Sequence, residues 1–469
     1  MSLFKNSLKL YSRNIAVIDD NGISISYKDL ESFSDFISEN IPKRSILISL
    51  NKNTLGSIIG YYSFIRNNIV SFMIDQKTET SLIQNLLNIY NPEFLWIPND
   101  NIKDFSNYSI ICKIYDYSLL RKKIDYELKI HPDLALCLST SGTTGSSKFV
   151  RLSYKNILSN AESIIKYLNI DHKERPITTL PMNYSFGLSI INSHFESGAT
   201  ILLTNYSLFQ KEFWNFLKEN KATSISGVPY TFEMLKKLRL TKMDLPSLNT
   251  LTQAGGKMHI DLIKEFAEYC NQNKKRLFIM YGQTEATARM SYLDSKFSLI
   301  KAGSIGKPIP GGKFSIVNES NEIINESDKV GELVYQGSNV SMGYSESTED
   351  FSRNDINNEK LYTGDLAKRD QDGFYYIVGR KKRFLKIFGN RINLDGLEQL
   401  LKDITHNCAC VGKDDYLVIY ITEKFKIDKV KDFIKSKILL HHSAFDVRFI
   451  DTIPKNLSGK INYSELKIK

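Results

Sequence analysis

The chain has 469 residues, of which 42% are hydrophobic, and this length and composition predict a soluble globular protein of about two to four domains. Its net charge is +10, from 62 basic and 52 acidic residues, but the lysines are scattered and arginines do not interleave with aromatic residues, which argues against nucleic-acid binding. No apolar run approaches the roughly 20 residues that span a bilayer, so no membrane span is expected.

The five cysteines favour a reducing compartment. Their number is odd and their spacing irregular, which indicates neither a disulfide framework nor a metal site. Cys408-Ala-Cys410, with the alternation through Val411, predicts a strand that carries two small buried thiols. Because no signal peptide is evident either, we expect a cytoplasmic protein.

Short apolar strands alternate with amphipathic helices through the first part of the chain. A strand at 45–50 precedes a helix at 54–66, and a strand at 69–74 precedes a helix at 80–90. Further short strands are predicted at 177–180, 200–203, 224–227, 250–253 and 277–280. Such alternation predicts a layered α/β architecture with largely parallel sheets.

The character of the sequence changes after residue 303. Glycine, proline and alternating strands at 313–317 and 331–335 predict a small β subdomain. We expect a large N-terminal domain over 1–380 and a small, mobile α+β domain over 382–469. The charged segment 379–384 is poor at packing and suits a hinge between them.

Two helices and two strands are predicted in the small C-terminal domain. The strands lie at 416–421 and 445–450, and the second helix runs from 428 to about 440. The first helix has an apolar face made of Leu394, Leu397, Leu400, Leu401 and Ile404. The second helix turns Val430, Phe433, Ile434 and Ile438 inward.

The segment Ser139-Thr-Ser-Gly-Thr-Thr-Gly-Ser-Ser-Lys148 lies between a predicted buried strand at 134–138 and a predicted helix. It contains seven hydroxyl groups, two glycines and a lysine. Glycines allow a tight loop with accessible N–H groups, hydroxyls add donors, and lysine adds a positive charge. The composition predicts a polyphosphate-binding loop, although the spacing is not Gly-x-x-x-x-Gly-Lys-Ser/Thr. An ordinary surface loop rich in Ser, Thr and Gly is the alternative.

Further motifs follow the loop in a recognisable order: Gln253-Ala-Gly-Gly-Lys257, Tyr281-Gly-Gln-Thr-Glu285, Tyr362-Thr-Gly-Asp365 with Gly379-Arg380, and Pro454-Lys-Asn-Leu-Ser-Gly-Lys460. Together they resemble the acyl-adenylate-forming superfamily of acyl-CoA and aryl-CoA ligases, peptide-synthetase adenylation domains and firefly luciferase. The resemblance runs from residues 26–30 to 466. It implies that a carboxylate attacks the α-phosphorus of ATP, which gives an acyl-adenylate and pyrophosphate.

Two anions meet in this reaction, so the site needs positive charge and a metal ion. The resemblance implies that Thr284 contacts the α-phosphate and that Glu285 holds Mg²⁺, which prefers hard oxygen ligands. A first-turn acid favoured by a helix dipole is the alternative for Glu285. The implied loop for the β- and γ-phosphates consists of Thr140, Ser141, Gly142, Thr143, Thr144, Gly145 and Lys148.

The rest of the nucleotide site is implied by the resemblance as well. Tyr281, followed by Gly282 and Gln283, covers one face of adenine, and the Gly255-Gly256-Lys257 backbone passes the other. Asp365 accepts hydrogen bonds from the ribose hydroxyls, and Arg380 reaches the ribose or a phosphate. The alternatives are a plain turn for the glycine pair, a turn aspartate for Asp365 and a surface arginine for Arg380.

Lys460 has the sharpest implied role, which is to place its ammonium where the carboxylate meets the α-phosphate. A surface lysine is the alternative. In the family, the C-terminal domain rotates between two poses about a hinge residue, here Lys382. Lys386, a catalytic residue of the second pose, and Gly389, in the thiol channel, match the segment that enters the site for thioester formation.

The sequence departs from the family pattern at two places. Ser147, Phe149 and Val150 stand where proline, glycine and valine usually flank the loop lysine. Asn462 and Tyr463 stand where an arginine often follows the catalytic lysine, which alters domain packing.

The implied acyl pocket contains Tyr184, Ser185, Phe186, Gly187, Ser226 and Gly227. Amino-acid-activating relatives carry an aspartate at the position of Gly187, and a buried ammonium without one is costly. An α-amino acid is therefore disfavoured, and a small or medium, partly polar carboxylic acid is expected.

The leading hypothesis is an AMP-forming acid–thiol ligase that uses ATP, Mg²⁺ and the thiol of CoA or of phosphopantetheine. One alternative is a stand-alone enzyme that loads an acyl carrier protein, for which the positive net charge would suit an acidic partner. The others are a non-catalytic acyl- or nucleotide-binding relative and a luciferase-like oxygenase.

Overall fold

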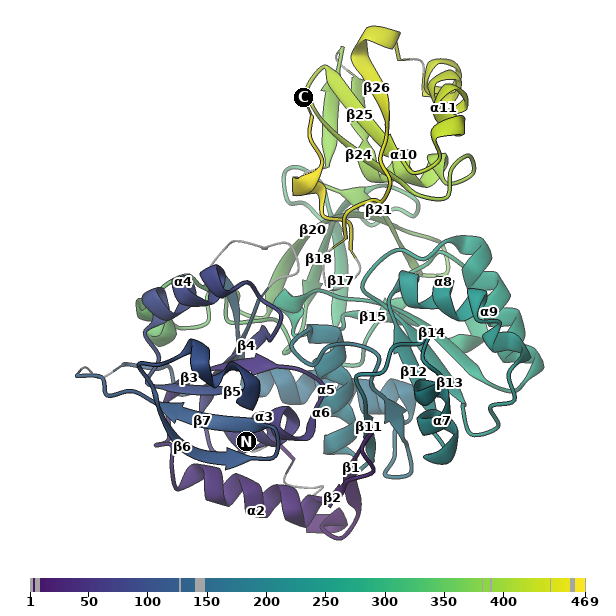
Figure 1. Ribbon diagram of the computed structural model, residues 1–469. Helices are drawn as coiled ribbons and strands as arrows, with labels where there is room; N and C mark the ends of the chain where they lie inside the picture. Colours follow the sequence, from purple (N-terminus) through teal and green to yellow (C-terminus); the bar gives the residue numbers. More distant parts are fainter. Residues whose placement is uncertain are drawn as a thin grey trace. The chain divides into compact units, whose positions relative to one another are not determined.

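A computed structural model describes residues 3–4, 9–125, 128–139, 148–381, 383–388, 390–438, 440–455 and 460–468, without the side chains of residues 384, 390 and 391. The chain forms two compact units. Unit 1 contains Met1–Lys313 and Gln336–Leu361, and unit 2 contains Phe314–Tyr335 and Tyr362–Lys469. Figure 1 shows the elements of both units.

The first large sheet of unit 1 has eight strands in the order β19-β9-β8-β4-β3-β5-β7-β6. They are β3 (Ile46–Asn51), β4 (Val70–Asp75), β5 (Phe94–Pro98), β6 (Ser109–Ile114), β7 (Tyr117–Arg121), β8 (Leu134–Ser139), β9 (Phe149–Ser153) and β19 (Tyr344–Ser345). The centre of the sheet is parallel, since β3 pairs with β4 and β5, and β4 pairs with β8. All six residues of β3 are buried, as expected for a parallel strand covered on both faces.

The second large sheet has nine strands in the order β16-β15-β14-β13-β12-β10-β11-β1-β2. They are β1 (Ile15–Asp19), β2 (Ser24–Ser26), β10 (Pro176–Ile177), β11 (Ile201–Leu203), β12 (Ser224–Gly227), β13 (Thr250–Gln253), β14 (Arg276–Tyr281), β15 (Ser291–Leu293) and β16 (Lys307–Pro308). Strands β12, β13 and β14 are parallel neighbours, with Gly227 opposite Gln253 and Gln253 opposite Ile279. Their carboxyl ends therefore meet at one edge, where ligands of open α/β sheets commonly bind.

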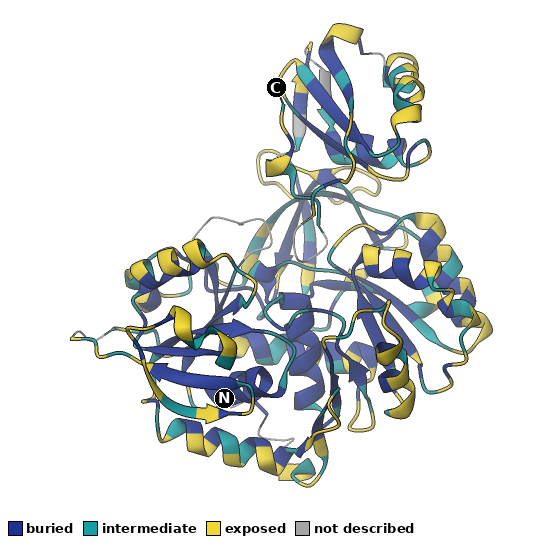
Figure 2. Cartoon of the chain, viewed as in Figure 1, coloured by how far each residue is buried: buried dark blue, intermediate teal, exposed yellow. Residues whose placement is uncertain are grey.

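Helices cover both large sheets and fill the space between them. They are α2 (Tyr27–Ser38), α3 (Leu55–Arg66), α4 (Thr80–Tyr90), α5 (Tyr154–Leu168), α6 (Ser185–Glu196), α7 (Lys211–Glu219), α8 (Pro229–Lys237) and α9 (Ile260–Gln272). In Figure 1, α5 and α6 lie between the two sheets, whereas α8 and α9 lie on the outer side of the nine-stranded sheet. Figure 2 shows α6 buried along almost its whole length, whereas α5 also carries exposed residues such as Lys155 and Glu162. The predicted layered α/β architecture is confirmed.

The segment after the 139–148 loop differs from the prediction. A helix was expected there, but β9 follows the loop and pairs antiparallel with β8, and α5 begins only at Tyr154. Arg151 in β9 is completely buried, and its guanidinium donates to the carbonyls of Met342, Tyr344 and Asp350. These contacts come from residues almost 200 positions away, so the local pattern could not indicate them.

In the described residues of unit 2 there are three sheets. A four-stranded sheet has the order β17-β18-β20-β21, a two-stranded sheet pairs β22 with β23, and a three-stranded sheet has the order β24-β25-β26. The strands are β17 (Lys313–Val317), β18 (Gly331–Gln336), β20 (Lys360–Arg369), β21 (Tyr375–Arg380), β22 (Phe384–Ile387), β23 (Asn390–Asn393), β24 (Cys408–Lys413), β25 (Tyr416–Ile421) and β26 (Phe445–Phe449). The β subdomain thus shares unit 2 with the C-terminal region, and the domain boundary predicted at residue 381 stays a prediction.

The helices of unit 2 are α10 (Leu394–Leu401) and α11 (Ile427–Phe433), and a short π-helix, Ile434–Ile438, follows α11. The second helix therefore departs from α geometry earlier than predicted. In α10, Leu394, Leu397 and Leu401 share one buried face, but Leu400 is 49% exposed, so its predicted inward position is wrong. Position 400 falls off the i, i+3, i+7 face that these three residues form.

The remaining short elements are 3₁₀ turns: Asn99–Asp104, Leu240–Lys242, Thr284–Ala286, Ser295–Phe297, Thr348–Ser352, Lys424–Lys426, His442–Ala444 and Tyr463–Glu465. The predicted strand with two small thiols is confirmed as β24, where Cys408 and Cys410 are buried and are not joined in a disulfide. Among the described helices, none has the length and apolarity needed to cross a membrane.

Candidate functional site

The Thr284–Glu285 segment lies beside the start of α6. Strand β14 ends at Tyr281, and the 3₁₀ turn Thr284–Ala286 follows at the carboxyl edge of the sheet. The hydroxyl oxygen of Thr284 lies 3.2 Å from that of Ser185, the first residue of α6, and both residues are buried. The residue predicted to contact the α-phosphate therefore touches a residue predicted to line the acyl pocket.

Glu285 is part of a polar cluster with Tyr344 and Lys148. The Tyr344 hydroxyl donates to Glu285 Oε1 at 2.9 Å. Burial, and then the Glu285 carboxylate, raise the pKa of Tyr344, so its hydroxyl stays protonated and remains a donor. Lys148 Nζ lies 3.9 Å from the centre of the Tyr344 ring and 3.3 Å from Glu346 Oε1. The sequence did not indicate Tyr344 or Glu346, because they lie far from any recognised motif.

The chemistry of this cluster fits a magnesium ion that is held mainly by a substrate. Glu285 Oε2 has no hydrogen bond from the described part of the chain. Within that part, no group of three or more acidic, histidine or cysteine side chains is arranged to hold a metal. Mg²⁺ commonly binds through one or two carboxylates together with phosphate oxygens and water. Glu285 fits that role, and a cage made by the protein alone is not needed.

The predicted adenine-binding turn is fixed by a buried glutamine. Gln253, at the end of β13, donates from Nε2 to the carbonyls of Ala254 and Gly256, at 3.1 and 2.9 Å. Gly255 has φ +82°, and a Cβ there would lie 2.6 Å from the Tyr184 hydroxyl. The turn therefore needs glycine both for its conformation and for its close approach to Tyr184.

Tyr281 and Gln283 lie at the end of β14 and are partly exposed. Gln283 Nε2 donates to the Tyr281 hydroxyl at 3.3 Å, which fixes the orientation of the ring. Gly256 and Lys257 are exposed on the neighbouring turn. The structure thus places both predicted adenine-binding segments at the carboxyl edge of adjacent strands, β13 and β14.

The predicted acyl-pocket residues divide into two groups. Tyr184, Ser185, Phe186 and Gly187 lie at the beginning of α6, and burial raises the pKa of Tyr184 to about 12. Ser226 and Gly227 end β12, where the Ser226 hydroxyl lies 2.7 Å from that of Thr252 on β13. The Ser226 hydroxyl is therefore satisfied within the sheet.

Gly187 is enclosed by the chain that precedes α6. A Cβ at this position would collide with the carbonyl oxygen of Pro181. Since this oxygen belongs to the backbone, no rotamer change relieves the collision. An aspartate at position 187 is therefore incompatible with this local geometry.

Arg289 was missed by the sequence analysis and lies against the same helix. It is only 3% exposed, and its Nε donates to Ser189 Oγ at 3.1 Å, one turn beyond Ser185. Its guanidinium lies 5.1 Å from the centre of the Phe186 ring. The available signal was an arginine four residues after Glu285, in a stretch that has no other charged residue from Ala286 to Leu293.

In unit 2, Asp365 and Arg380 face each other across paired strands. Their Cα positions are partners in the β20–β21 register, and Arg380 Nε lies 3.2 Å from Asp365 Oδ1. Asp365 is 4% exposed and lies within a strand, so it is not a turn aspartate. Arg380 is mostly exposed and is held by a buried carboxylate.

The two predicted catalytic lysines of unit 2 lie on different elements. Lys386 is exposed in β22 because its neighbours Leu385 and Ile387 point into the core. Its backbone N–H donates to Asp414 Oδ1 at 2.9 Å. Lys460 is half-buried and precedes Ile461, which forms an isolated antiparallel bridge with Lys455.

The predicted hinge segment packs better than expected. Arg383 Nε lies 2.6 Å from Asp395 Oδ1, and its Nη2 lies 2.7 Å from Glu398 Oε1. The Arg383 guanidinium also lies 3.6 Å from the centre of the Tyr463 ring, whose hydroxyl donates to Glu398 at 2.9 Å. The expectation of a poorly packed segment is therefore wrong at Arg383. Tyr463, which lies where the sequence departs from the family pattern after Lys460, is part of this contact.

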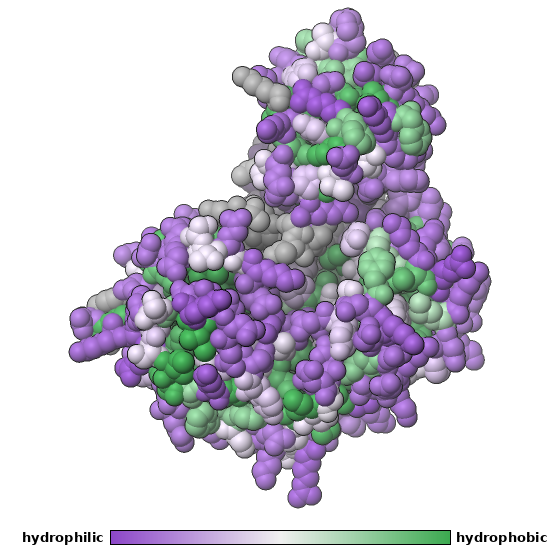
Figure 3. Space-filling view, viewed as in Figure 1, coloured by the Kyte–Doolittle hydropathy of each residue, from purple (hydrophilic) through white to green (hydrophobic). Residues whose placement is uncertain are grey.

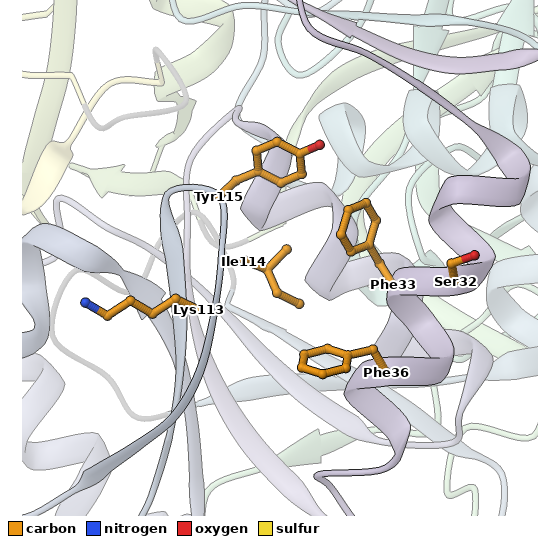
Figure 4. Close-up of a pocket in the computed structure, with 6 residues that line it drawn as sticks. All are labelled: Ser32, Phe33, Phe36, Lys113, Ile114 and Tyr115. Carbon is orange, nitrogen blue, oxygen red and sulfur yellow. The ribbon is translucent and has the colours of Figure 1, made fainter.

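A surface groove of about 510 Å³ contains none of the predicted site residues. It lies between α2, which supplies Ser32, Phe33 and Phe36, and the end of β6 at Ile114 with the following turn residue Tyr115 (Figure 4). Its other lining residue, Lys113, points away from the aromatic rings. Figure 3 shows apolar side chains gathered over the β6–β7 hairpin beside α2.

Several predicted residues lie outside the part of the chain that the structure describes. They are Thr140, Ser141, Gly142, Thr143, Thr144, Gly145, Lys382 and Gly389. Their roles stay predictions.

Comparisons with known proteins agree with the resemblance seen in the sequence. A family model described as AMP-binding enzyme matches residues 4–345. A probable CoA ligase of Humulus lupulus is 30% identical over 355 residues, which cover 71% of this chain and 63% of the relative. A luciferin 4-monooxygenase of Luciola mingrelica is 27% identical over 347 residues, which cover 70% and 62% of the two chains. The chain thus spans less than two thirds of the length of these two curated relatives.

A solved structure matches almost the whole chain. The o-succinylbenzoate CoA synthetase of Bacillus subtilis, in complex with its acyl-adenylate intermediate, has a TM-score of 0.81 and 21% sequence identity. The match covers 99% of this chain and 97% of the other. At this identity the similarity shows the fold, and the predicted α/β fold is confirmed by it.

Proposed function

The chain belongs to the family of AMP-binding enzymes, and from that premise we propose that it activates a carboxylic acid with ATP and then transfers the acyl group to a thiol. In the first half-reaction, a carboxylate oxygen attacks the α-phosphorus. The bond between this phosphorus and the oxygen that bridges the α- and β-phosphates breaks, and pyrophosphate leaves. In the second, a thiolate attacks the acyl carbon and AMP leaves, so that the product is a thioester.

One observation carries the proposal. The 3.2 Å contact between Thr284 and Ser185 joins the predicted α-phosphate ligand to the predicted acyl pocket. The new bond must form where the acid meets the α-phosphate, so the two groups of residues have to adjoin. Gly255 also approaches Tyr184 closely, since a Cβ at position 255 would lie 2.6 Å from the Tyr184 hydroxyl, and this brings the adenine-binding turn next to the acyl pocket.

The residues of unit 1 have separate tasks in the first half-reaction. Thr284 offers a hydroxyl donor to an α-phosphate oxygen, while Lys148 offers a charge to the outer phosphates. Tyr281 and the turn at Gly255 hold the base on opposite sides. Orientation of the two substrates lowers the entropy cost of their encounter, and fixed donors stabilise the developing charge.

Magnesium, where bound, would be held by Glu285 and would neutralise phosphate charge so that the anionic acid can approach. The Tyr344 hydroxyl occupies Oε1 of Glu285 and orients the carboxylate. This leaves Oε2 for the metal. Tyr344 is a positioning residue for Glu285 in this arrangement.

The residues of unit 2 would act after binding. We assign Asp365 to the ribose hydroxyls, Arg380 to the ribose or a phosphate, Lys460 to the first half-reaction and Lys386 to the second. Rotation about Lys382, with Gly389 leaving room for the thiol arm, would exchange the two lysines. The two orientations of the predicted 382–469 domain, one for each step, are part of the proposal.

The acid is a small or medium, partly polar carboxylic acid other than an α-amino acid. The enclosure of Gly187 by the Pro181 carbonyl supports the exclusion, because no side-chain carboxylate can be placed there to pair with an ammonium group. A screen of carboxylic acids by pyrophosphate–ATP exchange, followed by mass detection of the thioester, tests this function. Exchange that does not depend on any carboxylic acid would contradict it.

The acceptor is CoA or the phosphopantetheine of an acyl carrier protein. The net charge of +10 would favour association with an acidic carrier domain. Offering both acceptors in one reaction distinguishes them, because the mass of the trapped acyl adduct identifies which thiol was used. A cytoplasmic location fits the five free cysteines.

A further inference from the structure

A buried guanidinium lies behind the predicted acyl pocket. Arg289 donates from Nη1 to the Tyr167 hydroxyl at 3.0 Å and lies 3.3 Å from the sulfur of Met280. Its Nε is bonded to Ser189, and its plane lies near the Phe186 ring. These contacts come from α5, α6 and β14, so the position of the charge is fixed from three elements.

No carboxylate balances this charge within the described part of the chain. None of the Asp or Glu residues there forms an ion pair with Arg289, and Nη2 carries no hydrogen bond. The groups around it are neutral, since burial raises the pKa of Tyr167 and lowers that of His194 to about 4. Arginine stays protonated under all ordinary conditions, and buried charges in proteins are normally paired.

The position of Arg289 relative to the reacting end of the pocket follows from α6. Ser185, which contacts Thr284, and Ser189, which contacts Arg289, are four residues apart on this helix. Four residues correspond to a rise of about 6 Å and to the same side of a helix. An anion bound by Arg289 would therefore be separated from the activated carboxyl group by a spacer of only a few carbon atoms.

We propose that Arg289 binds a second carboxylate of the substrate, so that the enzyme selects compact dicarboxylic acids. This inference rests on the proposed function, since the first carboxylate is the one activated beside Thr284. The free Nη2 and the planar guanidinium suit a carboxylate, which accepts two parallel hydrogen bonds from arginine. The neutral contacts with Ser189, Tyr167 and Phe186 would hold the guanidinium in place for its ligand.

A purely structural role is the competing explanation. A cation lying over an aromatic ring stabilises a fold by itself, and Arg289 does lie near Phe186. Arg276 offers a matched control, because its guanidinium lies 5.7 Å from the centre of the Phe278 ring and 4.0 Å from the carboxylate of Glu174. Arg276 therefore has a ring contact like that of Arg289 and an acidic partner within the protein.

The test uses the full-length protein and matched pairs of acids: succinate, glutarate, adipate and terephthalate, each with its monomethyl ester. We expect kcat/KM for pyrophosphate–ATP exchange to be at least tenfold higher for one or more diacids than for the matching ester. Arg289→Met should lower the value for that diacid at least tenfold and leave the ester within threefold. Arg289→Lys should lie between, and Arg276→Met should keep the wild-type preference.

Isothermal titration calorimetry with the same acids supplies a readout that does not need catalysis. Diacid binding that exceeds ester binding and is lost in Arg289→Met supports the inference even if no acid supports exchange, an outcome that would contradict the proposed function alone. Absence of any diacid preference in the wild-type protein, by both methods, overturns the inference. So does a diacid preference that survives in Arg289→Met.

Discussion

At the scale of single residues, a few side chains hold the predicted ligand-binding groups in place through short hydrogen bonds. Glu285 is oriented by one hydroxyl, that of Tyr344, and Gln253 holds two carbonyls of the turn that precedes Lys257. Tyr344 could not be assigned from the motifs, and the motif that contains Gln253 does not reveal that its side chain holds the turn. Buried hydrogen bonds of this kind fix the positions of reacting groups before a substrate arrives.

Gly255→Ala should weaken ATP binding. Alanine is strained at φ +82°, by about 1 kcal/mol, and its Cβ would lie 2.6 Å from the Tyr184 hydroxyl. We expect KM for ATP to rise about tenfold, and we expect Tyr184→Phe in the same chain to recover part of the loss by removing the clashing oxygen. Steady-state kinetics of the two single variants and the double variant measure this. Equal KM values for Gly255→Ala and the wild-type protein would contradict the assigned turn.

His194 should make the protein less stable in mild acid. Burial, opposed only in part by a hydrogen bond to Ile190, lowers its pKa from 6.5 to about 4. Between these values the unfolded state binds more protons than the folded state, so the free energy of unfolding falls as the pH falls through this window. The loss attributable to His194 between pH 7.5 and pH 5 is about 2 kcal/mol.

His194→Asn should lack that part of the pH dependence. Urea unfolding at pH 7.5 and pH 5 gives the difference for each protein, and the change across pH cancels the direct cost of the substitution. If both proteins lose the same free energy over this range, His194 is not the group responsible.

At the scale of elements, the local sequence pattern predicted many of the strands and several of the helices but not their long-range partners. The strands at 224–227, 250–253 and 416–421 are confirmed with the predicted bounds, because apolar residues flanked by turns identify them. Strand β9 was missed because its central residue, Arg151, looks like a surface residue and is buried through contacts with residues 342–354. The candidate site follows the same rule: the motifs pointed to Thr284 and Glu285, but they gave no indication of Arg289 or Tyr344, which contact the same region through residues distant in sequence.

The element that follows β21 is anchored by charge as well as by its core. Arg383 connects the start of β22 to α10 through Asp395 and Glu398, and Tyr463 joins the same cluster from the far end of the chain. The segment that carries Lys460 is thereby attached to the residues that follow the predicted hinge. A change in this cluster should affect both.

Arg383→Met should destabilise unit 2 by about 3 kcal/mol, because it leaves the carboxylate of Glu398 buried without its cation. Tyr463→Phe should cost about 1 kcal/mol, since it removes one hydrogen bond and keeps the ring. Hydrogen exchange of β24 and α10 reports these changes locally. Arg383→Met combined with Glu398→Leu should recover part of the stability, and an unchanged exchange rate in Arg383→Met would contradict the assignment.

At the scale of the whole molecule, the account depends on two lysines from one unit that serve successive half-reactions. Lys386 is exposed on β22, and Lys460 is half-buried beside a bridge formed by Ile461. The two lie on separate elements of unit 2. Because each lysine is assigned one step, the proposal needs two orientations of the predicted 382–469 domain, one for each half-reaction.

The most direct measurement compares both half-reactions in Lys460→Ala and Lys386→Ala, with the exposed lysine variants Lys467→Ala and Lys413→Ala as controls. Pyrophosphate–ATP exchange reports adenylate formation, and thioester formation from added acyl-adenylate reports transfer. We predict that Lys460→Ala lowers exchange at least 100-fold and spares transfer, whereas Lys386→Ala lowers transfer more than exchange; 100-fold corresponds to about 2.7 kcal/mol of barrier. Equal losses of both half-reactions in both variants would contradict the separation of roles.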